Sequence, residues 1–154
     1  MSEHDIPWWT PQVGPNEYAN LRGVLESNYL NDGDVTTQFE QEIARLVGAT
    51  YAVGVTNGTS ALFLALAALG IGHGDEVIVP CRTFIATATA VAVRGAIPIF
   101  ADVDRVSGNI TADTIAAVLT QRTTAVIVVH LAGWPCDMDP IMELANEQGL
   151  KVIE

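Results

Sequence analysis

Residues 51–70, YAVGVTNGTSALFLALAALG, decide the fold of this chain. The first five, Tyr51–Val55, are apolar and include β-branched types, which predicts a buried strand. Thr56–Ser60 is a turn of small polar residues. Ala61–Leu69 is apolar on every side, which predicts a helix buried in a layered α/β protein. Strand, turn and helix in this order form the repeating unit of such proteins.

The turn before this helix has the chemistry of an anion site. Free backbone N–H groups and the hydroxyls of Thr59 and Ser60 lie at the positive end of the helix dipole, which favours a phosphate above all. Gly58 gives the turn backbone freedom. The alternative is that Thr59 or Ser60 only caps the helix. The spacing of these residues alone leaves the anion site and the helix cap both open, and slightly favours the cap.

Composition narrows the class of protein. The chain has 154 residues, of which 49% are hydrophobic and 16% charged, and this predicts one domain with a large buried interior. A formal charge of -11 would repel a phosphate backbone, so we expect no nucleic-acid partner. The most apolar window, near Ala61–Ile71, is too short to span a membrane.

Cysteine and histidine usage predicts a reduced, metal-free protein of the cytoplasm. Cys81 and Cys136 are far apart and form no CxxC pair, which favours two free thiols. The first residues, MSEHDIPWW, lack the pattern of a secretory signal. His4, His73 and His130 have no metal-ligand spacing, so we expect no metal site.

The rest of the chain alternates between helices and strands. Residues 1–15, with Trp8 and Trp9, predict an extended arm, and the polar loop 28–35 separates two amphipathic helices. Beyond residue 70 we expect strands at 76–79, 96–101, 124–129 and 151–153, joined by helices at 84–93, 111–119 and 137–148. Single helices between apolar strands predict a mainly parallel sheet in a three-layer α/β domain, residues 16–154. Because the chain ends beside a strand that should be buried, we expect it to be the front part of a longer protein.

Four stretches, in this order, resemble one known family: TNGTSALFLALAALGIGHGDEVIVP (56–80), TFIATATAV (83–91), PIFADVD (98–104) and HLAGWPCDMDPIM (130–142). Each is weak alone, but together they are similar to the DegT/DnrJ/EryC1/StrS family of pyridoxal-phosphate-dependent sugar aminotransferases. IPWWTPQVGPNE and NYLNDGDVTTQFE also resemble the N-terminus of that family. The resemblance implies the N-terminal part of the large domain of the fold type I transferases, left incomplete here.

The resemblance implies roles for single residues. Gly58, Thr59 and Ser60 match the turn that holds the phosphate of pyridoxal 5'-phosphate (PLP), which now outweighs capping. Phe84 matches the aromatic side chain that lies against the pyridine ring, where core packing was otherwise the better interpretation. His130 follows a strand and could approach the cofactor or substrate, but a structural role is equally open.

Other matches are weaker. Asn31 and Asp32 fall in a loop beside the active site, where the family often has threonines, so a substrate role for this loop is open. Asp102 and Asp104 resemble a carboxylate dyad, but turn formation is the better interpretation at the end of a strand.

The resemblance also shows what the chain lacks. PLP chemistry needs a lysine that binds the cofactor covalently and an acid that keeps the pyridine nitrogen protonated. In the family both follow the strand matched by KVIE, and the only lysine here, Lys151, leads into that strand at the wrong place. We therefore assign no catalytic residue in this chain and expect the 154 residues alone to be inactive.

The implied function of the full-length protein is transfer of an amino group, from glutamate, to a keto group of a nucleotide-linked sugar, in cell-surface polysaccharide or secondary-metabolite biosynthesis. A sugar dehydratase of the same family is one alternative, and a truncated, non-catalytic chain is another. A dinucleotide-binding oxidoreductase is disfavoured because no G-x-G-x-x-G follows an early strand. The family also implies a homodimer, with the arm 1–15 and the loop 28–35 reaching across the subunit boundary.

Overall fold

The computed structural model describes residues 10–154. The chain divides into two units, Met1–Gly54 and Val55–Glu154, which are described separately here. Trp8 and Trp9 lie outside the described residues. The predicted domain limits, 1–15 and 16–154, stay a prediction.

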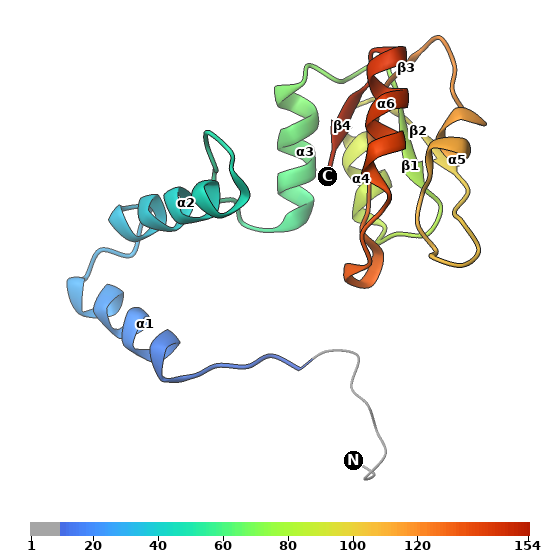
Figure 1. Ribbon diagram of the computed structural model, residues 1–154. Coiled ribbons are helices and arrows are strands. Elements are labelled where there is room, and N and C mark those ends of the chain that lie inside the picture. The colour runs from blue at the N-terminus through green and yellow to red at the C-terminus, as the bar shows by residue number, and fades with distance from the viewer. Residues whose placement is uncertain (1–9) are drawn as a thin grey trace. The chain divides into compact units, whose positions relative to one another are not determined.

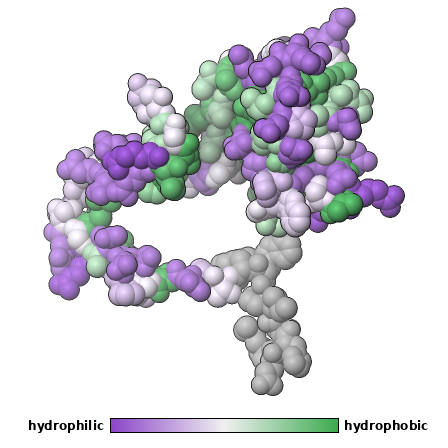
Figure 2. All heavy atoms as spheres, viewed as in Figure 1, coloured by the Kyte–Doolittle hydropathy of each residue, from purple (hydrophilic) through white to green (hydrophobic). Residues whose placement is uncertain are grey.

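The first unit contains two helices, α1 (Pro15–Ser27) and α2 (Asp34–Val47), as the sequence predicts (Figure 1). The Gly14 N–H donates to the Glu17 carboxylate at 2.8 Å and so satisfies one free donor at the start of α1. Of the residues in these two helices, Ala44 is the buried one. Apolar side chains such as Phe39 and Leu46 are therefore exposed in this unit, and Figure 2 shows hydrophobic surface on it.

The predicted strand at Tyr51–Val55 is wrong, because this segment is irregular. Tyr51 and Val53 are 84% and 77% exposed. No strand among the described residues pairs with the segment, and a single extended segment cannot satisfy its own backbone groups. Its Gly54 N–H instead donates to the Glu40 carboxylate at 2.6 Å.

The second unit is built on a four-stranded parallel sheet with the order β2-β1-β3-β4. The first three strands, β1, β2 and β3, are each followed in the chain by a helix that leads to the next strand (Figure 1). The elements are α3 (Gly58–Ala68), β1 (Glu76–Pro80), α4 (Ala86–Val93), β2 (Ile97–Ala101), α5 (Ala112–Ala116), β3 (Thr123–Ile127), α6 (Met138–Gln148) and β4 (Lys151–Ile153).

Two apolar clusters, one on each face of the sheet, make this unit a three-layer structure. Val77 and Val79 of β1 pack with residues of α3 and α4, whereas Ile78 packs with residues of α5 and α6. Successive side chains of a strand point to opposite faces, so a strand buried on both faces is apolar throughout. The predicted α/β class with a mainly parallel sheet is confirmed.

Helix α3 differs from the prediction in two ways. It begins at Gly58, three residues earlier than expected. It is also not buried on all sides: Leu66 is fully buried, but Leu64 is 47% exposed. In the part of the chain that the structure describes, no helix has the length and apolar character needed to cross a membrane.

Candidate functional site

A cleft of about 730 Å³ opens at the carboxyl ends of the strands. Its walls come from the start of α3, from the segment after β1, from the segment after β3 and from Glu154 after β4. Strand β1 is followed along the chain by β2 on one side of it, and β3 lies on its other side. Parallel sheets bind ligands at such a reversal of strand order. The volume lies in the range of small-molecule sites, about 300–1,000 Å³.

The start of α3 forms one end of the cleft. The Asn57 side chain accepts from the Ser60 N–H at 2.9 Å, so Asn57 is the cap, and the alternative that Thr59 or Ser60 caps the helix is wrong. Among the described residues, the N–H groups of Gly58 and Thr59 have no acceptor. The Ser60 hydroxyl lies 3.3 Å from the Thr56 hydroxyl.

Phe84 lies on the wall between β1 and α4. Its side chain is 75% exposed, so the alternative of core packing is wrong. The hydroxyls of Thr83 and Thr87, 2.9 Å apart, join the residues on either side of it. An exposed aromatic ring on an apolar cleft wall offers a flat surface to a ligand.

His130 lines the cleft at the end of β3. Its Nδ1 accepts from the Cys136 N–H at 3.0 Å, so the hydrogen of the neutral ring belongs on Nε2. Nε2 lies 3.5 Å from a carboxylate oxygen of Glu154. His130 therefore has a structural contact on one nitrogen and a cleft-lining carboxylate on the other.

The two cysteines are free thiols. Burial raises the pKa of the Cys136 thiol above its ordinary value, and this thiol donates to the Val129 carbonyl at 3.4 Å. Cys81 is exposed. Among residues 10–154, no group of three or more histidine, cysteine or acidic side chains is arranged to hold a metal ion.

Asn31 and Asp32 belong to the first unit, between α1 and α2. Both are exposed, and Asn31 lines a hollow formed by residues of these two helices and their connection. The residues that line the cleft all belong to the second unit. A substrate role for Asn31 and Asp32 stays a prediction.

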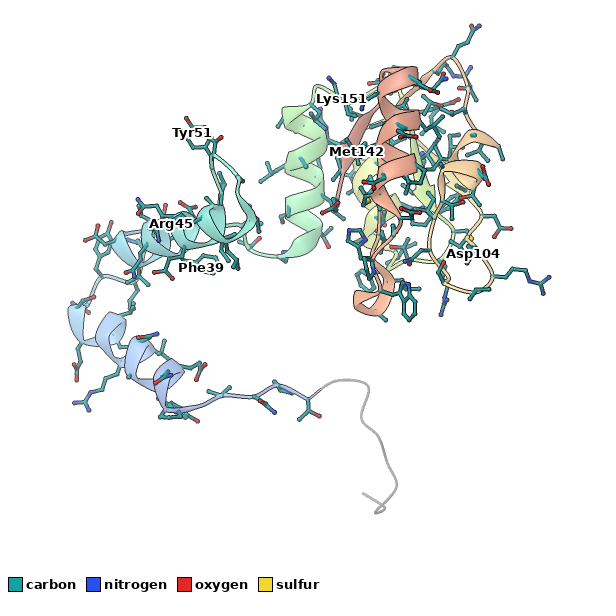
Figure 3. All side chains as sticks on the ribbon, viewed as in Figure 1. Phe39, Arg45, Tyr51, Asp104, Met142 and Lys151 are labelled. Atoms are coloured by element: carbon teal, nitrogen blue, oxygen red, sulfur yellow. The ribbon has the colours of Figure 1, made fainter. Side chains whose placement is uncertain are left out.

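Asp104 forms a turn, as expected, in the loop that follows β2 (Figure 3). Its carboxylate accepts from the N–H and the hydroxyl of Ser107, at 2.8 and 2.9 Å, and from the Val106 N–H at 3.1 Å. These hydrogen bonds, led by that of the Ser107 N–H, hold the pKa of Asp104 below its ordinary value. The Asp102 carboxylate accepts from the Val103 N–H at 2.8 Å. Neither carboxylate lines the cleft.

Lys151 lies at the start of β4 (Figure 3). The cleft is at the other end of this strand, where Glu154 lies. An exposed lysine at the amino edge of the sheet cannot act in the cleft, which agrees with assigning it no catalytic role.

Asn109 also bears on the cleft, although it was not among the predicted site residues. Its side chain is 3% exposed and hydrogen-bonds to two backbone groups of the segment that follows His130. No local pattern marks this residue, because its partners are 22 and 25 positions away in the chain.

These features fit a flat aromatic ring with a phosphate. The N–H groups of Gly58 and Thr59, without an acceptor in the described part of the chain, suit the phosphate. The apolar wall with Phe84 suits the ring. Fold and site thus define an α/β protein in which the N-terminus of helix α3 opens onto an apolar cleft.

The comparisons with known proteins identify the family. The model of the DegT/DnrJ/EryC1/StrS aminotransferase family matches residues 11–154, and the chain belongs to this family. The family is PLP-dependent, and its solved members include forms with PLP and with pyridoxamine phosphate (PMP).

Individual relatives agree with this assignment. The spore coat polysaccharide biosynthesis protein SpsC of Bacillus subtilis is 46% identical over 98% of this chain, which spans 39% of that protein. An aminotransferase from Psychrobacter cryohalolentis is 50% identical, with a TM-score of 0.90 over 96% of this chain and 37% of its own. NtdA from Bacillus subtilis, solved with bound PMP, is 35% identical, with a TM-score of 0.84 over 88% of this chain and 31% of its own. The chain thus spans less than half the length of these relatives.

Proposed function

We propose that these residues belong to a longer PLP-dependent aminotransferase that transfers an amino group from glutamate to a keto group of a nucleotide-linked sugar. The reaction would serve the synthesis of a cell-surface polysaccharide or a secondary metabolite, in the cytoplasm. The observation behind the proposal is that the N–H groups of Gly58 and Thr59, which have no acceptor among residues 10–154, lie at an apolar cleft in a chain of this family.

Different residues would bind the phosphate and the ring of the cofactor. The N–H groups of Gly58 and Thr59 and the hydroxyl of Thr59, which line the cleft, would bind the phosphate, together with the hydroxyl of Ser60, which lines a neighbouring hollow. Phe84, which lines the cleft, would offer its face to the ring and exclude water there. When bound, the cofactor supplies the electron sink for amino transfer. The covalent lysine and the acid at the ring nitrogen come from residues beyond the 154.

The first test uses the full-length protein loaded with PLP. Addition of glutamate should convert the absorbance spectrum from the PLP to the PMP form. A nucleotide-linked keto sugar should then restore the PLP form with one amino sugar made per cofactor. No conversion by any amino acid would overturn the proposal.

A dehydratase is the second candidate function, since family members differ at the position of the lysine. The residue at that position distinguishes the two: lysine supports amino transfer, and histidine supports dehydration. The third reading, a non-catalytic chain, is tested by the intact mass of the protein from its natural source. A mass of 16.4 kDa would support it, and a clearly larger mass would contradict it.

We also propose that the full-length protein is a homodimer, with the arm 1–15 and the loop 28–35 contributing to the partner's site. The family membership supports this arrangement. Deleting residues 1–15 should lower the dimer fraction measured by sedimentation. An unchanged dimer fraction would contradict the role of the arm.

Cell fractionation tests the proposed cytoplasmic location. Recovery of the protein outside the cytoplasmic fraction would contradict that location.

A further inference from the structure

One wall of the cleft is a strained turn. Leu131–Gly133 is a short turn with a kink, because Ala132 has left-handed backbone angles, φ 53° and ψ 27°, that do not belong to a 3-10 helix. This conformation is unfavourable for a residue with a Cβ atom. The turn is closed by hydrogen bonds from the Gly133 N–H to the His130 carbonyl, 3.1 Å, and from the Trp134 N–H to the Leu131 carbonyl, 3.0 Å. Two such bonds in a short segment do not by themselves select an unfavourable conformation.

Asn109 holds this turn at both ends. Its Nδ2 donates to the Trp134 carbonyl at 2.8 Å, and its Oδ1 accepts from the Leu131 N–H at 3.3 Å. The distance between the donor and acceptor of one carboxamide is fixed, so the two ends of the turn are held at one separation. Because the side chain is 3% exposed, water cannot replace either partner easily.

The backbone of Asn109 is itself fixed. Its carbonyl accepts from the Asp104 N–H at 2.8 Å, and its N–H donates to the Ser107 hydroxyl at 3.2 Å. The turn at Asp104–Ser107 therefore fixes the backbone of Asn109, and with it the position from which the carboxamide extends. On the far side of the strained turn, the Cys136 N–H donates to His130 Nδ1 at 3.0 Å.

The turn faces the cleft through His130, Leu131 and Ala132, which all line it. We propose that Asn109 is a positioning residue of the cleft: its carboxamide keeps the turn 131–134 in one conformation, so that this wall is formed before a ligand binds. For the identity of that ligand the inference rests on the proposed function. A preformed wall saves the ordering cost that a mobile one would add to binding.

The test compares two variants in the full-length protein. Asn109→Leu keeps the approximate shape and removes both hydrogen bonds to the turn. Thr111→Ala is the matched control: Thr111 caps α5 by accepting from the Thr114 N–H at 3.3 Å, and it does not line the cleft. Both changes destabilise the fold, but only the first releases the turn. Asn109→Asp is a second variant of nearly unchanged shape, in which a second acceptor faces the Trp134 carbonyl.

Hydrogen exchange gives the first readout. The N–H groups of Leu131, Gly133 and Trp134 report on the turn, and that of Val128, which donates to the Ile153 carbonyl at 2.8 Å, reports on opening of the sheet. In Asn109→Leu the turn amides should exchange about tenfold faster relative to Val128, as expected for two lost hydrogen bonds. Asn109→Asp should change them in the same direction, and Thr111→Ala should leave the ratio unchanged.

Affinity for PLP gives the second readout. Asn109→Leu should weaken binding about tenfold, and Thr111→Ala should leave it unchanged at a temperature where both variants are folded. If the turn and the affinity respond equally in Asn109→Leu and Thr111→Ala, the inference is overturned. A looser turn with unchanged affinity also overturns it, because Asn109 would then be only structural.

Failure of the proposed function gives a different result from failure of the proposed role of Asn109. If the unsubstituted protein binds no PLP, the proposed function fails. Exchange at the turn then tests whether Asn109 holds the turn: a rise limited to the Asn109 variants supports this part of the inference, and no rise overturns the inference as a whole.

Discussion

The two edges of the sheet are built in opposite ways. At the amino edge, Glu76 is 2% exposed, and its carboxylate accepts from the Thr120 hydroxyl and from the Arg122 guanidinium, with Arg122 Nε at 2.9 Å. At the carboxyl edge, the N–H groups of Gly58 and Thr59 find no acceptor among the described residues, and Phe84 is 75% exposed. Polar groups satisfied by protein stabilise a fold, whereas those left free are available to a ligand.

A substitution in the core between the two edges of the sheet should have a larger free-energy effect than a substitution at either edge. Ile78 lies in the middle of β1 and is fully buried. Ile78→Ala should lower the free energy of unfolding by about 2–5 kcal/mol, because it leaves a cavity. Val106→Ala is the control, since Val106 is 95% exposed; it should change stability by less than about 0.5 kcal/mol. Equal stability of the two variants in urea would contradict the assigned core.

Thr59→Val should separate binding from stability at the carboxyl edge. Loss of a hydroxyl that donates to a phosphate is worth about 1.5–3 kcal/mol, so PLP affinity should fall about ten- to a hundredfold. The free energy of unfolding without cofactor should change little. Thr59→Ser keeps the hydroxyl and is the control. Unchanged affinity in Thr59→Val, measured by cofactor titration, would contradict the phosphate assignment.

Phe84→Ala tests the ring contact and should have a smaller effect. Stacking of two aromatic rings contributes about 0.5–1.5 kcal/mol, which corresponds to about a two- to tenfold loss of PLP affinity. Ile85 is the matched control, because it is 69% exposed and does not line the cleft. Equal PLP affinities of Phe84→Ala and Ile85→Ala would argue against the stacking role.

Glu76→Gln should have the smallest effect at neutral pH, because glutamine keeps the shape and one acceptor oxygen. The hydrogen bond from Thr120, followed by that from Arg122, holds the pKa of Glu76 below its ordinary value of 4.5. A carboxyl group with a lowered folded-state pKa adds stability above pH 4.5, and this stability is lost as the pH falls through the folded-state value.

The acid limb of the stability curve therefore provides the measurement for Glu76. Thermal unfolding from pH 7 down to pH 2 should show a flatter loss of stability in Glu76→Gln than in the unsubstituted protein. PLP affinity at pH 7, a property of the other edge, should not change. Parallel stability curves would mean that the ion pair at the amino edge contributes nothing to the acid sensitivity.

Much of the second unit was predictable from local sequence. Apolar runs such as Glu76–Pro80 and Thr123–Ile127 are bounded by turn residues, and their positions agree with the predicted strands. The sequence also predicts an anion site at the start of α3, because a polar turn before an apolar helix is a local pattern, and this assignment stays a prediction.

The wrong or missing predictions from sequence share one physical cause: they depend on contacts between residues that are distant in the chain. Tyr51–Val55 has the composition of a strand, but a strand also needs a neighbour to pair with. Helix α3 has the composition of a buried helix, yet exposure of Leu64 depends on what packs against it. Asn109 looks like an ordinary turn residue until its distant partners are known.

The sequence by itself determined the alternation of helices and strands after residue 70 and the family, since both are carried by local patterns in the chain. Only the tertiary structure decided which nitrogen of His130 carries the hydrogen and that Asn109 holds the wall of the cleft. Both depend on hydrogen bonds to backbone groups whose positions are set by the packed fold. Local composition specifies which elements form, and packing specifies which polar groups meet.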